Sequence, residues 1–412
     1  MYEETIRWLD GVDLQLLGLD NNGQKEKGSM IIKNAYVYTL EQGFVKKDTV
    51  IEHGYFSNQA RLPSDGETVI DAQENYLIPG LVDVHFHGCE GYDFSDGTPE
   101  ALDAIGDYEL RNGITAICPA AMTLSEEMLR GICENAFEYA SDDQSGARGR
   151  LVARLCGLHL EGPFIAEEKK GAQNPAYIRE PDIGMFHRLQ EAAQGLIRLI
   201  TIAPETAHAM DFIRELHEQV HISLGHTTSD YDTAYEAFGL GADHVTHCFN
   251  AMPGFTHRAP GVIGAAADAS HVMLELICDG VHVHPSAVRA AFSLFGEERM
   301  ILISDSMRAT GMSDGAYTLG GLNVEVKGNR ATLADGTLAG SVTNLMDCMR
   351  TAVAMGIPLE TAVRCVTYNP AKSIGVETLY GRIAAGAYGD CVLLSRTDLS
   401  VQNVILGGEL VK

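Results

Sequence analysis

Several features that would place a chain in other protein classes are missing from this sequence. No run of about eighteen apolar residues could span a bilayer, and the acidic start lacks the basic and apolar regions of a secretory signal peptide. The nine cysteines are odd in number and form no C-x-x-C pair, which is typical of free thiols in a reducing compartment. We therefore expect a cytoplasmic protein without a disulfide framework.

Basic residues are also scarce. The 412 residues include 30 Lys and Arg against 56 Asp and Glu, which gives a formal net charge of -26 at pH 7. Nucleic acids and anionic membranes bind basic surfaces, so we expect neither as a partner. An anionic small molecule would have to be held by a local cluster of cationic side chains and backbone amides.

The two ends of the chain share one pattern. Short runs rich in β-branched residues, separated by polar or glycine-containing turns, occupy residues 30–79 and recur in residues 373–412. This pattern is typical of antiparallel strands. We predict one small β-domain, a β-sandwich formed from both chain ends. Residues 1–29 are largely polar, and we treat them as an N-terminal extension.

The residues between, 80–372, alternate apolar runs of strand length with amphipathic, helix-like runs such as 99–111. Eight βα units of this kind predict an α/β protein with a (β/α)8 TIM-like barrel, and a doubly wound sheet is the alternative. Residues 317–330 predict a hairpin inserted late in the barrel. The strand candidates are Leu81–His85, Ile114–Pro119, Leu151–Glu161, Ile197–Ala203, His221–Gly225, His244–His247, Met273–Asp279 and Met300–Ser304.

Two histidines end the first of these strands. His85 and His87 are two positions apart, and alternate side chains of an extended chain point the same way. Both can therefore reach the C-terminal mouth of the barrel, where the chemistry of such barrels usually lies. Taken alone, the pair could equally be unrelated histidines in a turn.

Later strand ends carry further candidate ligands. Glu161, His226 and Asp305 each stand at or just after the end of a predicted strand. His244 and His247 are three apart, so only one can face the mouth; His247 is nearer the strand end, and we expect His244 to pack lower down or outside. Each of these residues alone could be an ordinary turn or core residue. The ordered series indicates a divalent-metal centre with a free carboxylate beside it.

The sequence motifs around these residues resemble those of a known group of enzymes. The relevant segments are PGLVDVHFHG (79–88), GLHLEGPF (157–164), KKGAQNP (169–175), SLGH (223–226), THCFNAMP (246–253), RAPG (258–261), DGVHV (279–283), SDSM (304–307) and GTLAGS (336–341). They resemble the amidohydrolase superfamily, metal-dependent hydrolases on a β/α barrel. Within it, the chain is similar to the family of N-acetylglucosamine-6-phosphate deacetylases, from about Met30 to the C-terminus.

The resemblance implies roles for individual residues. Glu161, His226 and His247 match the principal metal ligands, whereas His85 and His87 match a pair that supports a second metal in two-metal members. It thus implies one or two divalent transition metal ions per chain, zinc or iron, with Glu161 bridging them. The implied substrate contacts are Ala172, Gln173, Asn250, Ala251, Arg258, Asp279, His282, Leu338, Ala339 and Gly340.

The implied activity is hydrolysis of the acetamide of N-acetyl-D-glucosamine 6-phosphate to D-glucosamine 6-phosphate and acetate, in amino-sugar catabolism. A metal-activated water would attack, and Asp305, which matches the family's acid/base, would take its proton and then protonate the leaving amine. Arg258 and His282 would hold the phosphate, and His159 or a neighbour could assist the oxyanion. The family also suggests a homodimer. Gln173 stands where relatives often carry histidine, so sugar preference is less determined than reaction type.

Two other hypotheses remain open at this stage. One is an amidohydrolase acting on a different N-acyl amino sugar or a cyclic amide. The cyclic-amide relatives typically use a barrel lysine where Glu161 stands. The other is a catalytically inactive barrel that serves as a scaffold, which the intact series of ligands and Asp305 disfavours.

Overall fold

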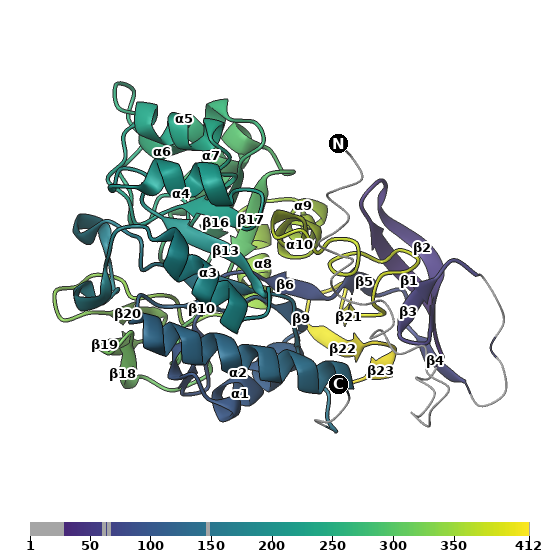
Figure 1. Ribbon diagram of the computed structural model, residues 1–412. Coiled ribbons are helices and arrows are strands. Elements are labelled where there is room, and N and C mark those ends of the chain that lie inside the picture. Colours follow the sequence, from purple (N-terminus) through teal and green to yellow (C-terminus); the bar gives the residue numbers. More distant parts are fainter. Residues whose placement is uncertain (1–28, 60–62, 64–66, 146–148, 412) are drawn as a thin grey trace.

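The computed structural model describes residues 29–411 except 60–62, 64–66 and 146–148. The predicted N-terminal extension, apart from Ser29, therefore lies outside the described residues. Figure 1 shows a larger α/β body, in which helices surround a curled sheet, and a smaller sheet beside it that combines purple and yellow strands from the two ends of the chain. The expected combination of a barrel and a sheet domain built from both ends is confirmed.

The smaller sheet has eight strands in the order β23-β22-β21-β5-β1-β2-β3, and β4 pairs in parallel with the first half of β1. A core of its own, which includes Ile32, Phe56 and Leu393, packs within it. The domain limits expected at 79/80 and 372/373 stay predictions. The strands are β1 (Met30–Thr39), β2 (Gly43–Glu52), β3 (Tyr55–Ser57), β4 (Thr68–Asp71), β5 (Tyr76–Pro79), β21 (Cys391–Leu394), β22 (Val401–Leu406) and β23 (Glu409–Leu410).

The barrel strands are parallel and mostly buried on both faces, as expected when helices cover a parallel sheet. They are β6 (Leu81–Asp83), β9 (Ile114–Ile117), β10 (Ala120–Ala121), β11 (Arg154–Leu155), β12 (Leu158–Glu161), β13 (Ile197–Ile202), β14 (His221–Leu224), β15 (His244–Val245), β16 (Met273–Ile277) and β17 (Met300–Ile303). Strands β10 and β12 to β17 form one ladder, and β11, β9 and β6 form another. Two backbone hydrogen bonds after β6 join these two sheets into a closed barrel. They run from Asp305 N to His85 O at 3.0 Å and from Ala120 N to Phe86 O at 2.7 Å.

Two of the predicted strands are interrupted. The strand predicted over 114–119 ends at Ile117, and β10 begins only after Pro119, which has no N–H to give to a ladder. The segment predicted over 151–161 divides into β11 and β12 around Gly157. A Cβ at Gly157 would meet Arg198 Cγ at 2.6 Å, so the chain passes its neighbour too closely there for any larger residue.

The helices follow the barrel strands and cover the outside of the sheet (Figure 1). Side-chain caps begin several of them; Thr98 accepts a hydrogen bond from Ala101 N, and Asn344 accepts one from Asp347 N. They are α1 (Pro99–Arg111), α2 (Glu126–Ser145), α3 (Ile183–Ala192), α4 (Ala209–Leu216), α5 (Tyr231–Gly239), α6 (Gly261–Asp268), α7 (Pro285–Phe295), α8 (Leu345–Ala354), α9 (Leu359–Val366) and α10 (Tyr368–Ser373). Within the described part of the chain, none of them is long and apolar enough to cross a membrane.

Two small antiparallel units stand on the barrel. β7 (Gly88–Cys89) pairs with β8 (Tyr92–Asp93) directly after the first barrel strand. The hairpin predicted over 317–330 is present and gains a third strand, so that β18 (Gly315–Leu319), β19 (Leu322–Lys327) and β20 (Arg330–Thr332) form one sheet. Its tight turn uses Gly320 and Gly321, both with positive φ, as a two-residue hairpin turn requires.

Candidate active site

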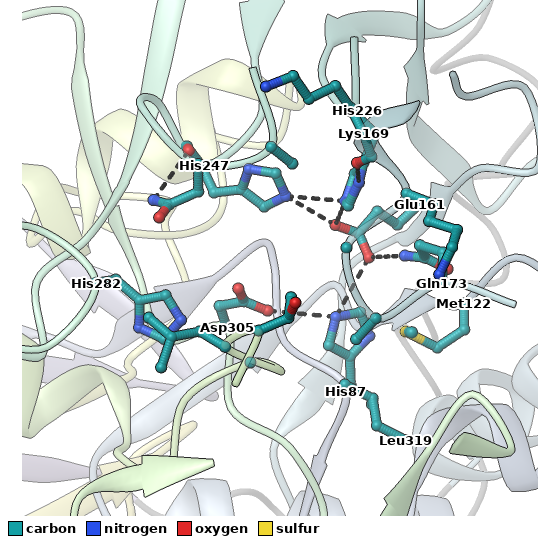
Figure 2. A pocket seen from close by; sticks show the side chains of 18 of the residues that line it. His87, Met122, Glu161, Lys169, Gln173, His226, His247, His282, Asp305 and Leu319 are labelled. Atoms are coloured by element: carbon teal, nitrogen blue, oxygen red, sulfur yellow. Dashed lines mark hydrogen bonds and ion pairs between the residues drawn. The ribbon is translucent and has the colours of Figure 1, made fainter. Parts of the chain in front are cut away.

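The candidate ligands lie at the C-terminal ends of the barrel strands, and all of them except His85 line one cavity (Figure 2). His226, His247 and Asp305 each follow the end of their strand by two residues and have positive φ angles of 48°, 28° and 47°. Residues other than glycine rarely adopt this backbone conformation, which costs on the order of 1–3 kcal/mol per residue. The backbone thus turns sharply at each strand end, and the surrounding fold holds it there.

Glu161 is the centre of the first cluster. Its Oε1 lies 3.1 Å from Nε2 of both His226 and His247, and the two Nε2 atoms are 3.2 Å apart. All three side chains are buried. One carboxylate oxygen and two imidazole nitrogens at this spacing form a donor set that a single divalent transition metal ion accepts.

A second cluster shares Glu161. His85 Nε2 lies 3.2 Å from Glu161 Oε1, and His87 Nε2 lies 3.4 Å from Glu161 Oε2. Asp305 Oδ1 completes this group at 3.3 Å from His87 Nε2 and 4.0 Å from His85 Nε2. The two oxygens of Glu161 therefore face both clusters, which is the arrangement that a bridging carboxylate needs.

The hydrogen bonds behind the histidines favour metal binding. When Nδ1 donates to an oxygen, Nε2 keeps its lone pair for a metal. His85 Nε2 is also buried and has no hydrogen-bond partner in the described part of the chain, so these residues fit a metal. The Nδ1 atoms lie 2.7 Å from Glu275 Oε2 in His85, 3.0 Å from the Ala120 carbonyl in His87, and 2.7 Å from the Lys169 carbonyl in His226.

Both carboxylates of the site are ionised at neutral pH. Burial acts to raise the pKa of Glu161, but the imidazoles of His85 and His226 outweigh it and hold that pKa well below its usual value. Burial opposes ionisation of Asp305 as well, yet the hydrogen bond from His87 and the charge of His85 lower its pKa. Asp305 is therefore available as a proton acceptor.

The cavity in front of these residues has a volume of about 490 Å³, enough for a sugar phosphate. His85, Arg258, Asp279 and Ala339 are the predicted site residues that do not line it. The predicted residues in its wall are His87, Glu161, Ala172, Gln173, His226, His247, Asn250, Ala251, His282, Asp305, Leu338 and Gly340.

Two predicted substrate contacts have other partners. Gln173 is buried; its Nε2 lies 2.5 Å from Glu161 Oε2, and its Oε1 accepts a hydrogen bond from Thr123 N at 2.7 Å. It therefore orients the central carboxylate. Arg258 is exposed, and its guanidinium lies 2.6 Å from His257 Nε2. Asp279 does not line the cavity, but Asp279 Oδ2 lies 2.7 Å from Nδ1 of His282, which does.

Two further histidines from the sequence analysis, His159 and His244, lie behind the cavity wall. His159 Nε2 is 2.8 Å from Thr201 Oγ1. Burial, together with the charge of His85, lowers the pKa of His159 to about 3, so its ring is neutral. His244 is also buried, with Nε2 3.2 Å from Glu275 Oε1. Neither ring is in the lining, so His159 is not placed to assist an oxyanion in this geometry.

Sequence reasoning missed Glu275 and the two lysines of the KKGAQNP segment. Lys169 and Lys170 line the cavity, and their position in that segment was the available signal. Glu275 lies within β16, in the apolar run Met273–Ile277. A charged residue inside a buried strand is itself a signal, because such residues are rarely buried without a partner.

Comparisons with known proteins agree with this geometry. A sequence model of the amidohydrolase family matches residues 76–411. An N-acetylglucosamine-6-phosphate deacetylase of Bacillus subtilis is 35% identical over 382 residues, covering 92% of this chain and 93% of the relative. An N-acetylgalactosamine-6-phosphate deacetylase of Escherichia coli O157:H7 is 34% identical over 345 residues, covering 83% of this chain and 89% of the relative.

A solved structure has the same fold. It is a mutant N-acetyl-D-glucosamine-6-phosphate deacetylase from Mycobacterium smegmatis in complex with N-acetyl-D-glucosamine-6-phosphate. The superposition has a TM-score of 0.84 at 33% identity and covers 93% of this chain and 99% of that chain.

Proposed function

The chain belongs to the amidohydrolase family, and we propose that it hydrolyses the acetamide of N-acetyl-D-glucosamine 6-phosphate to D-glucosamine 6-phosphate and acetate. The observation that carries this proposal is the convergence of Glu161, His226 and His247 on one point, with the Asp305 carboxylate on the same cavity. The curated relatives and the solved structure named above supply the substrate class. An inactive scaffold or a cyclic-amide hydrolase is not favoured.

We propose zinc or iron as the metal. Glu161, His226 and His247 would hold the first ion, and His85 and His87 would hold a second with Glu161 between them. A divalent ion bound there would supply a water acidic enough to be a nucleophile near neutral pH and would polarise the acetyl carbonyl. An acetamide is too poor an electrophile to react quickly without such help.

Asp305 carries out the proton transfers in this proposal. Its lowered pKa keeps it as a carboxylate, so it can take a proton from the attacking water. It then returns a proton to the nitrogen of the leaving group, because an amine cannot leave as an anion. His87 Nε2 lies 3.3 Å from Asp305 Oδ1, which places the carboxylate beside the proposed second metal site.

The phosphate needs cations, and the cavity wall supplies them. His282 is partly buried beside Asp279, and Lys169 Nζ lies 3.4 Å from the carbonyl of Met252, next to the Asn250–Ala251 segment. Lys169 also accepts the His226 hydrogen bond with its backbone carbonyl. We propose that its side chain contacts the phosphate, while its backbone orients a metal ligand.

Replacing Lys169 with methionine tests this role. The backbone bond to His226 survives, whereas the charge is lost, so kcat/KM for the phosphorylated sugar should fall on the order of tenfold or more. The unphosphorylated sugar should be affected far less, as measured by acetate release from both. Lys327→Met is the matched control, since Lys327 is exposed and does not line the cavity. Equal losses on both sugars would contradict the phosphate role.

A pH profile tests His282. Burial lowers the pKa of His282, but the Asp279 carboxylate outweighs it and raises that pKa above the ordinary 6.5. The imidazolium is present below the raised pKa and is lost above it. KM for the phosphorylated sugar should therefore rise as the pH increases beyond this value, and His282→Asn should flatten the rise. A profile that is identical in the variant would remove His282 from phosphate binding.

A second candidate substrate is N-acetylgalactosamine 6-phosphate. The E. coli relative with that name is nearly as similar as the B. subtilis relative, and the two sugars differ only in the orientation of one hydroxyl group. Both ends of the Gln173 amide are hydrogen-bonded within the protein, to Glu161 and to Thr123 N. Gln173 therefore does not determine which of the two sugars is preferred. Parallel kcat/KM measurements on both epimers distinguish the two candidates.

We propose a homodimer in which Arg258 of one chain contacts the phosphate in the cavity of the other chain. In its own chain Arg258 is exposed and outside the cavity wall, and Phe255 in the same loop is 52% exposed. An exposed apolar side chain close to an arginine that does not line its own chain's cavity favours a protein–protein interface at this loop. Light scattering should then give twice the chain mass of 44.5 kDa, and a monomeric mass would refute the dimer.

The cysteines support the cytoplasmic location that the composition predicts. All nine are free and buried, and burial raises their pKa values, for example that of Cys133 to about 12. Such thiols are protonated and unreactive, which suits structural residues in a reducing compartment.

A further inference from the structure

Glu275 is a buried carboxylate outside the cavity wall. It lies in β16, in a strand whose residues are all buried, and its side chain is fully inaccessible to solvent. A charge in such a place requires partners, because removing it from water is costly. The partners of Glu275 therefore indicate what it does.

Its contacts reach two strand ends. Oε2 lies 2.7 Å from His85 Nδ1 and 3.1 Å from the backbone N of His247, and Oε1 lies 3.2 Å from His244 Nε2. His85 Nδ1 and Glu275 Oε2 are as close as a hydrogen bond requires, so this pair is an orienting contact and not two ligands of one ion.

The bond to Glu275 sets which nitrogen of His85 faces the cluster. An acceptor at Nδ1 keeps the proton there and leaves the Nε2 lone pair directed at Glu161 and Asp305, where it has no hydrogen-bond partner among the residues that the structure describes. His87 and His226 are oriented by neutral backbone carbonyls. Among these three histidines, only His85 is held by a carboxylate, which makes an imidazole a stronger donor.

Charge balance leads to the same conclusion. Glu161 and Asp305 together carry two negative charges, which one divalent cation neutralises. A second divalent cation in the same buried volume needs further negative charge nearby, and Glu275 supplies it on the side of His85. The set Glu161, His226 and His247 includes no side-chain contact to Glu275.

We propose that Glu275 is a positioning residue that determines whether the second metal site fills, by orienting and polarising His85, while the first site does not depend on it. This rests on the proposed metal-dependent function, but metal content is measured without turnover. A protein that shows the expected metal pattern but releases no acetate would therefore refute the deacetylase proposal and leave this one standing.

The test is Glu275→Gln, which keeps the shape and removes the charge. Metal-free wild type and variant are titrated with Zn²⁺ against a competing chelator, with metal analysis of the desalted protein and Co²⁺ absorption as a second readout. Wild type should bind two equivalents. The variant should bind the first with wild-type affinity and the second about 10- to 100-fold more weakly.

Thr201→Val is the matched control, because it removes a buried polar group behind the site, 2.8 Å from His159, without touching His85. It should bind both equivalents as wild type does, and thermal unfolding confirms that each variant is folded. If the glutamine variant does not fold, Glu275→Asp takes its place. It withdraws the oxygen from both His85 Nδ1 and the backbone N of His247, and the second site should still weaken far more than the first.

Four results would overturn the proposal. They are a wild type that binds one equivalent only, a Glu275 variant that binds the second as wild type does, equal weakening of both sites, and a Thr201 variant that loses the second metal to the same extent.

Discussion

Replacing Asp305 with asparagine is expected to lower kcat by about 10²- to 10⁴-fold, the range for loss of a general acid/base. The amide has nearly the same shape but cannot accept the proton of the attacking water or return one to the amine. Glu161, His226 and His247 keep their mutual distances, so the first metal site and the substrate affinity should be close to those of wild type. Metal analysis, kcat and KM for the phosphorylated sugar measure each part.

Asp279→Asn is the matched control for this variant. It makes the same chemical change in the other carboxylate near the cavity, but Asp279 contacts His282 and no candidate metal ligand. It should raise KM for the phosphorylated sugar and change kcat little. If Asp305→Asn turned over at a wild-type rate, Asp305 would have no part in the proton transfers.

Glu161→Gln should produce a loss of activity on the order of a thousandfold or more, and its cause should be loss of metal. Glu161 Oε1 is the atom that both His226 and His247 approach to 3.1 Å, and Oε2 faces His87. An amide in this place has no charge, and only one of its two terminal atoms can act as a ligand. Metal analysis after desalting should find both sites depleted.

Gln173→Ala is the control for that substitution. It removes the hydrogen bond to Glu161 Oε2 and leaves the carboxylate itself. Metal binding should weaken by about 10- to 100-fold, the range for a residue that orients a ligand. A Glu161→Gln protein that keeps its full metal content would show that the ion is held elsewhere.

Regular elements were predictable where local signals agree. Helix α1 has the limits expected from its sequence, because Thr98 caps it, Pro99 begins it and Asn112 ends it. The barrel strands end earlier than their apolar runs suggest. The observed strands end at Leu224, Val245 and Ile303, and two residues later His226, His247 and Asp305 adopt positive φ angles that no strand allows. The departures from strand geometry thus lie at the site itself.

The candidate metal ligands could be predicted because parallel strands bring their C-terminal ends together. Glu275 could not be, because an isolated glutamate in an apolar strand does not indicate which of several neighbouring histidines it bonds. The position of Arg258 could not be predicted either. It depends on the course of an exposed loop, and a motif match says nothing about which cavity that loop serves.

The most direct test of the central claim is acetate release from N-acetyl-D-glucosamine 6-phosphate at defined metal loading. Metal-free protein should release no acetate, and activity should return in proportion to added Zn²⁺ or Fe²⁺ until the Glu161–His226–His247 site is full. A fully loaded protein that releases no acetate from this sugar phosphate or its epimer would contradict the account, as would full activity without metal.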